Sequence, residues 1–149
     1  MENYTRILSF NIEHHTFQEL KSSLNIGRYD HRCAFIPNTN QIMITGGNNG
    51  KFAFTEIFNT EDGSVTIGST MNYRRSQHGI GVLTIKGEDI LVAFGGGYDM
   101  IVSGRNYLDS VEVYNAQKGI WIRTNMKLKE PKMAFGFLNI KLADIKSGL

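Results

Sequence analysis

The chain has 149 residues, enough for one domain with its own core, and its composition of 41% hydrophobic and 20% charged residues is ordinary for a soluble protein. A net charge of +2, with no run of five like charges, argues against a surface for nucleic acid or for an anionic membrane. Cys33 is the only cysteine, no apolar signal sequence is found near Met1, and no stretch approaches the ~18 apolar residues of a membrane-spanning helix, so we expect a cytoplasmic protein.

Short segments typical of β-strands follow one another along the chain, and no segment favours a long helix. Some are largely apolar, as in a strand buried on both faces, and others mix apolar residues with Glu, as in a strand near solvent. In chain order the expected strands are Cys33–Ile36, Gln41–Thr45, Phe54–Asn59, Val65–Ile67, Gly79–Ile85, Ile90–Phe94, Val111–Asn115 and Ile120–Arg123. The connections are rich in Asn, Asp and Gly, which accept the positive φ of hairpin turns. The sequence therefore predicts an all-β chain.

These strands recur as a repeated unit. The landmarks that recur are the Arg-x-x-His of residues 28–31 and 75–78, the glycine pairs at 46–47 and 95–96, and the Glu-x-x-Asn of Glu56–Asn59 and Glu112–Asn115. Their offsets grow from 47 to 49 to 56 residues. The growth predicts turn-like insertions at Lys86–Asp89 and at Met100–Asn106.

The same spacing extends to both ends of the chain. Six residues after an Asn stands an apolar residue, which is Phe17, Val65 or Trp121. Four residues before the arginine position stands another, which is Leu24, Met71 or Met126. On this spacing Glu130 takes the arginine position of a last unit, and Met133 takes its histidine position. We expect one region over residues 1–149, with a half unit at 4–23, whole units at 28–70 and 75–125, and the start of another at 130–149.

Four strands per unit, a period of about fifty residues, a glycine pair after the second strand and a later aromatic residue resemble the kelch repeat. The resemblance implies a partial β-propeller with four-stranded antiparallel blades, two complete and two partial. Its structural signature falls on Gly46, Gly47, Glu56, His78, Gly95, Gly96, Glu112, Tyr114 and Trp121. The WD-repeat alternative requires a Trp-Asp pair, which the sequence lacks. We expect Trp121 to fill the space between neighbouring blades, and Val65 to leave a looser contact at the equivalent position.

A closed propeller needs roughly four to eight blades, whereas this chain supplies about three. An open arc would leave apolar faces bare at both ends, and covering each face is worth on the order of 10 kcal/mol. We therefore expect either a longer propeller that supplies the missing blades or self-association, in which two copies close into six blades.

The resemblance also implies a partner-binding surface. In kelch substrate adaptors, arginines before the innermost strand and a Tyr after the glycine pair line a pocket for acidic peptides. The matching residues are Arg28, Arg75 and Tyr98, with Asn48 in place of the Tyr one unit earlier. The alternative is that the arginines only pair with neighbouring loop carboxylates. The insertion Tyr98–Leu108, with Ile101, either takes part in recognition or covers the adjacent blade.

The remaining reactive side chains favour structural roles. His14 and His15 are adjacent, so on a strand they would point to opposite faces and could not bind one metal together. We expect His31 and His78 to be structural hydrogen-bonding residues and Cys33 to be a core thiol. Gly-rich residues 46–51 lack the spacing of a phosphate-binding loop. We therefore expect no metal, no cofactor and no catalytic residues.

On this basis the chain is expected to bind another protein rather than to act as an enzyme. The resemblance implies the substrate-recognition part of an adaptor for a cullin-RING ubiquitin ligase. The alternatives are an actin or cytoskeletal kelch protein, and a propeller enzyme with its site at the channel mouth.

Overall fold

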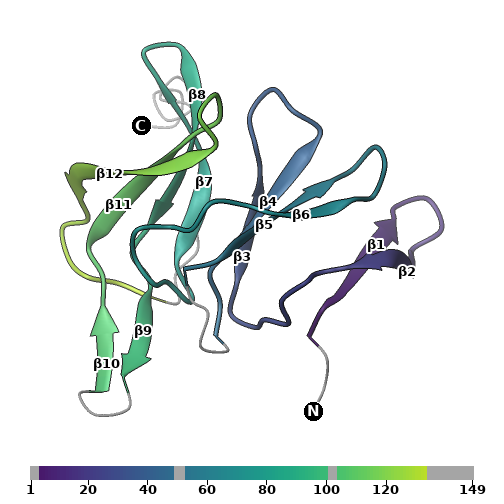
Figure 1. Cartoon of the computed structure of the whole chain (residues 1–149), viewed down its shortest axis with the longest axis horizontal. Coiled ribbons are helices and arrows are strands. Elements are labelled where there is room, and N and C mark those ends of the chain that lie inside the picture. The colour runs from purple at the N-terminus through teal and green to yellow at the C-terminus, as the bar shows by residue number, and fades with distance from the viewer. Residues whose placement is uncertain (1–3, 49–52, 101–103, 134–149) are drawn as a thin grey trace, which may run out of the picture.

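The computed structural model describes residues 4–48, 53–100 and 104–133, and this part of the chain is all-β (Figure 1). The prediction of an all-β chain is confirmed. The strands are β1 (Arg6–Asn11), β2 (Thr16–Ser23), β3 (Arg32–Phe35), β4 (Gln41–Thr45), β5 (Thr55–Asn59), β6 (Val65–Ile67), β7 (Gly79–Ile85), β8 (Glu88–Phe94), β9 (Gly97–Met100), β10 (Gly104–Tyr107), β11 (Ser110–Asn115) and β12 (Ile120–Lys127).

Two four-stranded antiparallel sheets have the same connectivity. The first sheet follows the chain in the order β3-β4-β5-β6, and the second follows it in the order β7-β8-β11-β12. β1 and β2 form a separate two-stranded hairpin beside the first sheet (Figure 1). The repeated sequence landmarks therefore correspond to repeated sheets.

The two expected insertions are not both simple turns. Residues 86 and 87 do form a turn, but β8 begins directly after them, at Glu88. Met100–Asn106, expected to be turn-like, instead contributes to a second hairpin, β9–β10, which lies between β8 and β11 in the chain. This hairpin extends past the lower ends of the sheets in Figure 1.

Backbone hydrogen bonds show which residues are equivalent from one unit to the next. The amide of Met71 donates to the carbonyl of Ala53 over 2.9 Å, and the amide of Leu24 donates to the carbonyl of Thr5 over 2.8 Å. Thr5 and Ala53 each lie three residues before the matched positions Leu8 and Glu56, so β1 corresponds to β5. The first hairpin therefore corresponds to the third and fourth strands of a sheet.

The same bonds correct the expected register of the last unit. Leu128, not Met126, donates its amide to Asp109, the residue equivalent to Ala53, over 2.7 Å. Gly47 donates to the carbonyl of Arg75 over 2.9 Å, and its counterpart Gly96 donates to the carbonyl of Lys132 over 2.6 Å. Lys132 therefore takes the arginine position that the sequence pattern assigned to Glu130. Met133 accordingly does not take the histidine position.

The core lies between the two four-stranded sheets. Trp121 is 5% exposed, and its ring centroid lies 5.3 Å from that of Tyr114, which is 8% exposed. Both belong to one cluster with Ile36 and Met43 of the first unit. This placement agrees with the expectation that Trp121 fills the space between neighbouring sheets. Val65, at the equivalent position, is only half-buried.

The glycine pairs provide a backbone that no other residue would adopt without strain. Gly47 and Gly96 have φ of +99° and +81°. A Cβ on Gly96 would lie 2.6 Å from the Cβ of His78 and 2.7 Å from the carbonyl oxygen of Ser76. The residues that approach the glycine pairs so closely come from the Arg-x-x-His segments.

A substitution of Gly96 tests this close approach. Gly96→Ala is expected to reduce the free energy of unfolding by about 2 kcal/mol, because left-handed strain adds to overpacking. Gly87→Ala is the matched control, since Gly87 also has positive φ (+84°) but nothing within 4 Å of its virtual Cβ. Urea unfolding should therefore show a smaller loss for Gly87→Ala, of about 1 kcal/mol. Equal losses would mean that the contact with Ser76 and His78 is unimportant.

Candidate interaction edge

Each unit contains a buried ion pair between its Arg and Glu landmarks. Arg28 is 3% exposed, and its Nη2 donates to Glu56 Oε2 over 2.7 Å. Its Nη1 donates to the backbone carbonyls of Gly46 and Phe54, over 2.9 and 2.8 Å. Glu56 also accepts from the backbone and side-chain amides of Asn25, over 2.6 and 3.1 Å. The segment that precedes β3 is thus tied to both β4 and β5.

The second unit repeats this arrangement. Arg75 is fully buried, and its Nε donates to Glu112 Oε1 over 3.2 Å. Its Nη1 donates to the carbonyls of Gly95 and Ser110, over 2.6 and 3.1 Å. Glu112 accepts two bonds of 2.7 Å from Asn72, as Glu56 accepts two from Asn25. The repeated set of donors and acceptors makes this cluster a structural element of each unit.

Burial of the two arginines limits which groups their side chains can bind. Burial lowers the pKa of the Arg28 and Arg75 guanidinium groups, and the nearby Glu56 and Glu112 carboxylates act in the opposite direction. A guanidinium group whose donors are already shared among buried acceptors cannot also bind a peptide carboxylate unless those bonds break. The geometry favours the alternative in which the arginines pair with neighbouring carboxylates, but these carboxylates come from strands β5 and β11 and not from loops.

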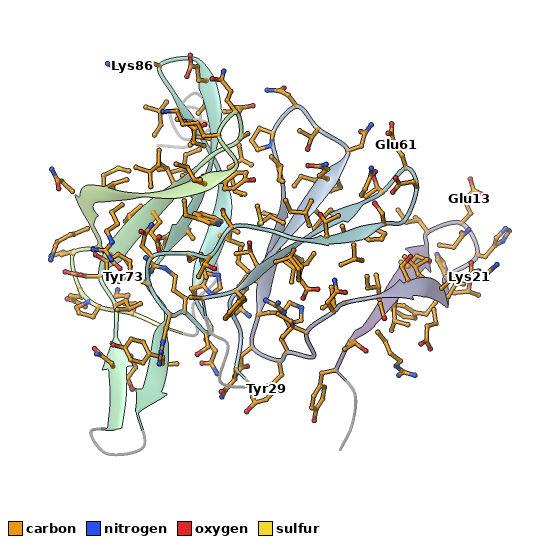
Figure 2. The ribbon with its side chains drawn as sticks, viewed as in Figure 1. Glu13, Lys21, Tyr29, Glu61, Tyr73 and Lys86 are labelled. Carbon is orange, nitrogen blue, oxygen red and sulfur yellow. The ribbon has the colours of Figure 1, made fainter. Side chains whose placement is uncertain are left out.

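Three side chains close in sequence to these arginines, those of Tyr29, Asp30 and Gln77, are exposed or half-buried. Tyr29 is 45% exposed and lies at the lower edge of the molecule in Figure 2. Asp30 and Gln77 have φ of 55° and 49°, and the Gln77 side-chain amide donates to Asp30 Oδ2 over 2.9 Å. The Gln77 backbone amide also donates to the Asp30 carbonyl over 2.9 Å. These bonds connect the Arg-x-x-His segments of the two units.

The residues after the glycine pairs lie beside the same segments. Asn48 forms a β-bridge with Tyr29, and Gly97 forms the equivalent bridge with Ser76. Tyr98 is half-buried, and its hydroxyl accepts a 2.9 Å bond from the Asn106 side chain, which holds β9 and β10 together. Tyr107, at the end of this hairpin, is 48% exposed. Ile101 lies outside the described residues.

Together these residues define a candidate interaction edge. The set consists of Tyr29, Asp30, Asn48, Gln77, Tyr98, Asn106 and Tyr107. The edge carries two exposed tyrosines among amide and carboxylate groups, which suits hydrogen bonding and aromatic contact rather than recognition of negative charge alone. Of the five expected partner-binding residues, Asn48 and Tyr98 lie on this edge.

Tyr29, Gln77 and Asn106 were not predicted from the sequence. Tyr29 and Gln77 stand inside the Arg-x-x-His landmarks, where attention falls on the repeated residues rather than on the variable ones between them. A position that differs between the two Arg-x-x-His segments, inside an otherwise repeated turn, is the signal in the sequence for a surface residue.

The histidines of the two landmarks have different surroundings. His78 is fully buried, and burial followed by the nearby Arg75 charge lowers its pKa to about 3. Thr45 Oγ1 donates to the Arg32 carbonyl over 3.2 Å, so it accepts the 2.8 Å bond from His78 Nε2. Burial, followed by the Arg28 charge, also lowers the pKa of His31. Within the described residues no group of three or more His, Cys, Asp and Glu side chains could hold a metal.

Cys33 does not lie in the core as expected. It is exposed at the wall of a cavity between the β1–β2 hairpin and the first sheet. Apolar surroundings on the cavity side still raise the pKa of its thiol. Strand β3 is less covered than its apolar sequence suggests, because the neighbouring β1–β2 hairpin has only two strands.

No protein-family model and no curated protein matches this chain. Residues 4–48, 53–100 and 104–133 include no helix with the length and apolar character needed to cross a bilayer.

Proposed function

We propose that the chain is a kelch-type protein-interaction module that binds its partner through the candidate interaction edge. The observation that carries the proposal is the repeated buried cluster around Arg28 and Arg75. Each cluster fixes an Arg-x-x-His segment against two strands. The side chains between the arginine and the histidine are therefore held on a rigid support. Recognition residues are commonly presented in this way, on loops above a rigid scaffold.

Three features support the kelch type and a propeller arrangement of the sheets. Both four-stranded sheets follow the chain in order, both second strands end in a glycine pair with positive φ, and both Arg–Glu clusters have the same acceptors. A role in substrate recognition for a cullin-RING ubiquitin ligase adaptor, in the cytoplasm, follows from the resemblance alone. The cytoskeletal alternative would use the same edge.

The nature of the edge changes the expected partner. With Arg28 and Arg75 buried, the exposed groups are phenol, amide and carboxylate groups. Such groups bind an extended peptide by hydrogen bonds to its backbone and by aromatic contact with its side chains. We therefore propose a peptide segment with exposed backbone groups as the ligand, without a requirement for acidic residues.

A peptide selection tests this proposal. Peptides selected from a phage-displayed library against the folded chain are expected to lose about tenfold or more in affinity on Tyr29→Ala, a loss typical of a central aromatic contact. Tyr107→Ala should weaken the same peptides. Ile67→Ala is the control, because Ile67 is exposed on β6, outside the edge. Fluorescence polarisation would measure each Kd, and binding unchanged by both tyrosine substitutions would contradict the proposed edge.

A further inference from the structure

Strand β8 extends past its neighbour β11 at one end of the second sheet. It pairs with β7 over its whole length, from Glu88 to Phe94, but its pairing with β11 covers only residues 91–94. In the first sheet, by contrast, the first residue of β4, Gln41, already has a partner in β5. The extension follows from the insertion at residues 86–89, because the tight turn of residues 86 and 87 lets β8 begin at once, at Glu88.

A pocket lies beside this extension, and its volume is about 390 Å³. Three segments contribute polar side chains to its lining. They are residues 88–90 of β8, residues 115–117 at the end of β11 and in the turn that follows, and Pro37 and Asn38 of the turn between β3 and β4. The other lining residues are Leu91, Val113, Tyr114 and Ile122. Apolar side chains with a few polar groups among them are typical of a pocket for a small ligand or a single side chain.

The charges at this pocket have one sign. Glu88 and Asp89 are the charged residues of its lining, and both are exposed. Neither forms an ion pair within the part of the chain that the structure describes, although Asp89 Oδ1 accepts a 2.6 Å bond from the Thr84 hydroxyl. Lys86 and Lys118, the cations nearest to the pocket in sequence, are exposed and do not line it. The pocket therefore favours a ligand with a positive charge.

Tyr114 adds a buried hydroxyl to the same lining. The residue is 8% exposed, and its hydroxyl has no hydrogen-bond partner among the described residues. The hydroxyl oxygen lies 3.9 Å from the position that a Cβ on Gly119 would take, so it reaches the β11–β12 turn that forms one wall of the pocket. Polar groups with so little exposure normally have a partner. A phenol oxygen can accept a hydrogen bond from a cationic donor, so a ligand of this charge would satisfy it.

We propose that the pocket binds an alkyl chain that ends in a positively charged nitrogen group, as in a lysine side chain or a small aliphatic amine. The alkyl chain packs against the apolar side chains of Leu91 and Val113. The nitrogen group has three donors, and it finds acceptors in the carboxylates of Glu88 and Asp89 and in the hydroxyl of Tyr114.

A metal ion fits this pocket less well than an organic cation. Among the described residues no group of three or more His, Cys, Asp and Glu side chains could hold a metal, and the apolar part of the lining would give a bare ion no ligand. The pocket is also separate from the candidate interaction edge. Lys86, in the turn before β8, lies at the opposite end of the molecule from Tyr29 (Figure 2). The inference therefore does not rest on a peptide bound at that edge.

A nuclear magnetic resonance titration of the isotope-labelled full chain tests the pocket. The probe is n-butylammonium, and n-butanol is its neutral match in length. The cation is expected to shift the amide signals of the lining residues saturably, with a Kd on the order of 1–10 mM, and butanol should bind about fivefold or more weakly. The double variant Glu88→Gln with Asp89→Asn should raise the Kd of the cation about fivefold or more. Tyr114→Phe should raise it about threefold.

Glu13→Gln is the matched control, because Glu13 is exposed in the β1–β2 turn, outside the pocket, and should leave the Kd unchanged. Circular dichroism would show that each variant folds. Butanol binding as tightly as butylammonium would overturn the proposal, because charge would then have no role. A Kd unchanged in the double variant, or shifts confined to other residues, would also overturn it.

Two further probes identify the source of the ligand. Lysine blocked at both its amino and carboxyl ends presents the chain as a protein does, and cadaverine presents it as a free amine. Tighter binding of the blocked lysine would assign the pocket to a side chain of a partner protein, and tighter binding of cadaverine would assign it to a small amine; either result supports the pocket. Tyr29→Ala should leave both Kd values unchanged, so the pocket and the interaction edge are tested separately.

Discussion

Glu112→Ala is expected to reduce the free energy of unfolding by about 3–5 kcal/mol, because it leaves a buried cation without its carboxylate. Arg75 is fully buried, and Glu112 is its only acidic partner among the described residues. Glu112 also accepts from the backbone amides of Asn72 and Tyr73, over 2.7 and 3.1 Å. The substitution removes the acceptor of these two backbone amides and of the Asn72 side-chain amide, as well as the ion pair. A domain of ordinary stability, roughly 5–15 kcal/mol, would lose a large share of its free energy of unfolding.

Urea unfolding followed by circular dichroism would measure the loss. Glu88→Ala is the matched control, since Glu88 lies in β8 of the same sheet but is exposed. Glu56→Ala should cost a similar amount, because Glu56 pairs with the buried Arg28 and accepts from Asn25 in the same way. If Glu112→Ala lost no more stability than Glu88→Ala, the Arg–Glu clusters would not be the rigid supports on which the interaction edge depends.

The strand pattern could be predicted because it depends on local sequence. An apolar run that ends in glycines identified β4 at Gln41–Thr45, and β-branched residues identified β6 at Val65–Ile67, both with their observed bounds. The hairpin β9–β10 was not foreseen. Its strands read Gly-Tyr-Asp-Met and Gly-Arg-Asn-Tyr, which show few of the β-branched residues that favour strands.

The roles of Arg28 and Arg75 could not be decided from the sequence. Their pairing partners lie 28 and 37 residues away, and only the packing of β5 and β11 brings them together. A repeated arginine has the same pattern whether it faces a peptide or a buried glutamate. The clue available in the sequence was that a glutamate recurs in both units, as the arginine does.

The register predicted for the last unit was wrong for a different reason. β12 extends from Ile120 to Lys127, while the equivalent β6 covers only Val65–Ile67. Met126 follows Trp121 by five residues, whereas the equivalent residues follow Phe17 by seven and Val65 by six, and Leu128 follows Trp121 by seven. Strand length is set by pairing with β11, which the spacing of apolar residues does not record.

Stability of the fold is expected to fall as the pH is lowered below about 6.5, because His78 is buried as a neutral side chain. Its ordinary pKa is 6.5, and its pKa in the folded chain is about 3. Between these values the unfolded chain binds a proton that the folded chain does not, so acid favours unfolding. The contribution is full above pH 6.5, falls by up to ~1.4 kcal/mol per pH unit, and amounts to a loss of about 3 kcal/mol at pH 4.

A histidine substitution separates this contribution from that of the carboxylates. His78→Gln keeps a donor for Thr45 but cannot titrate, so the difference in unfolding free energy between wild type and variant should narrow as the pH falls from 7 to 4. His14→Gln is the control, since His14 lies exposed in the β1–β2 turn. The lowered pKa of His31 contributes in the same direction and remains in both proteins, so it cancels from the difference. A difference that stays constant with pH would mean that His78 is protonated in the folded chain, which its buried bond to Thr45 and the nearby Arg75 charge oppose.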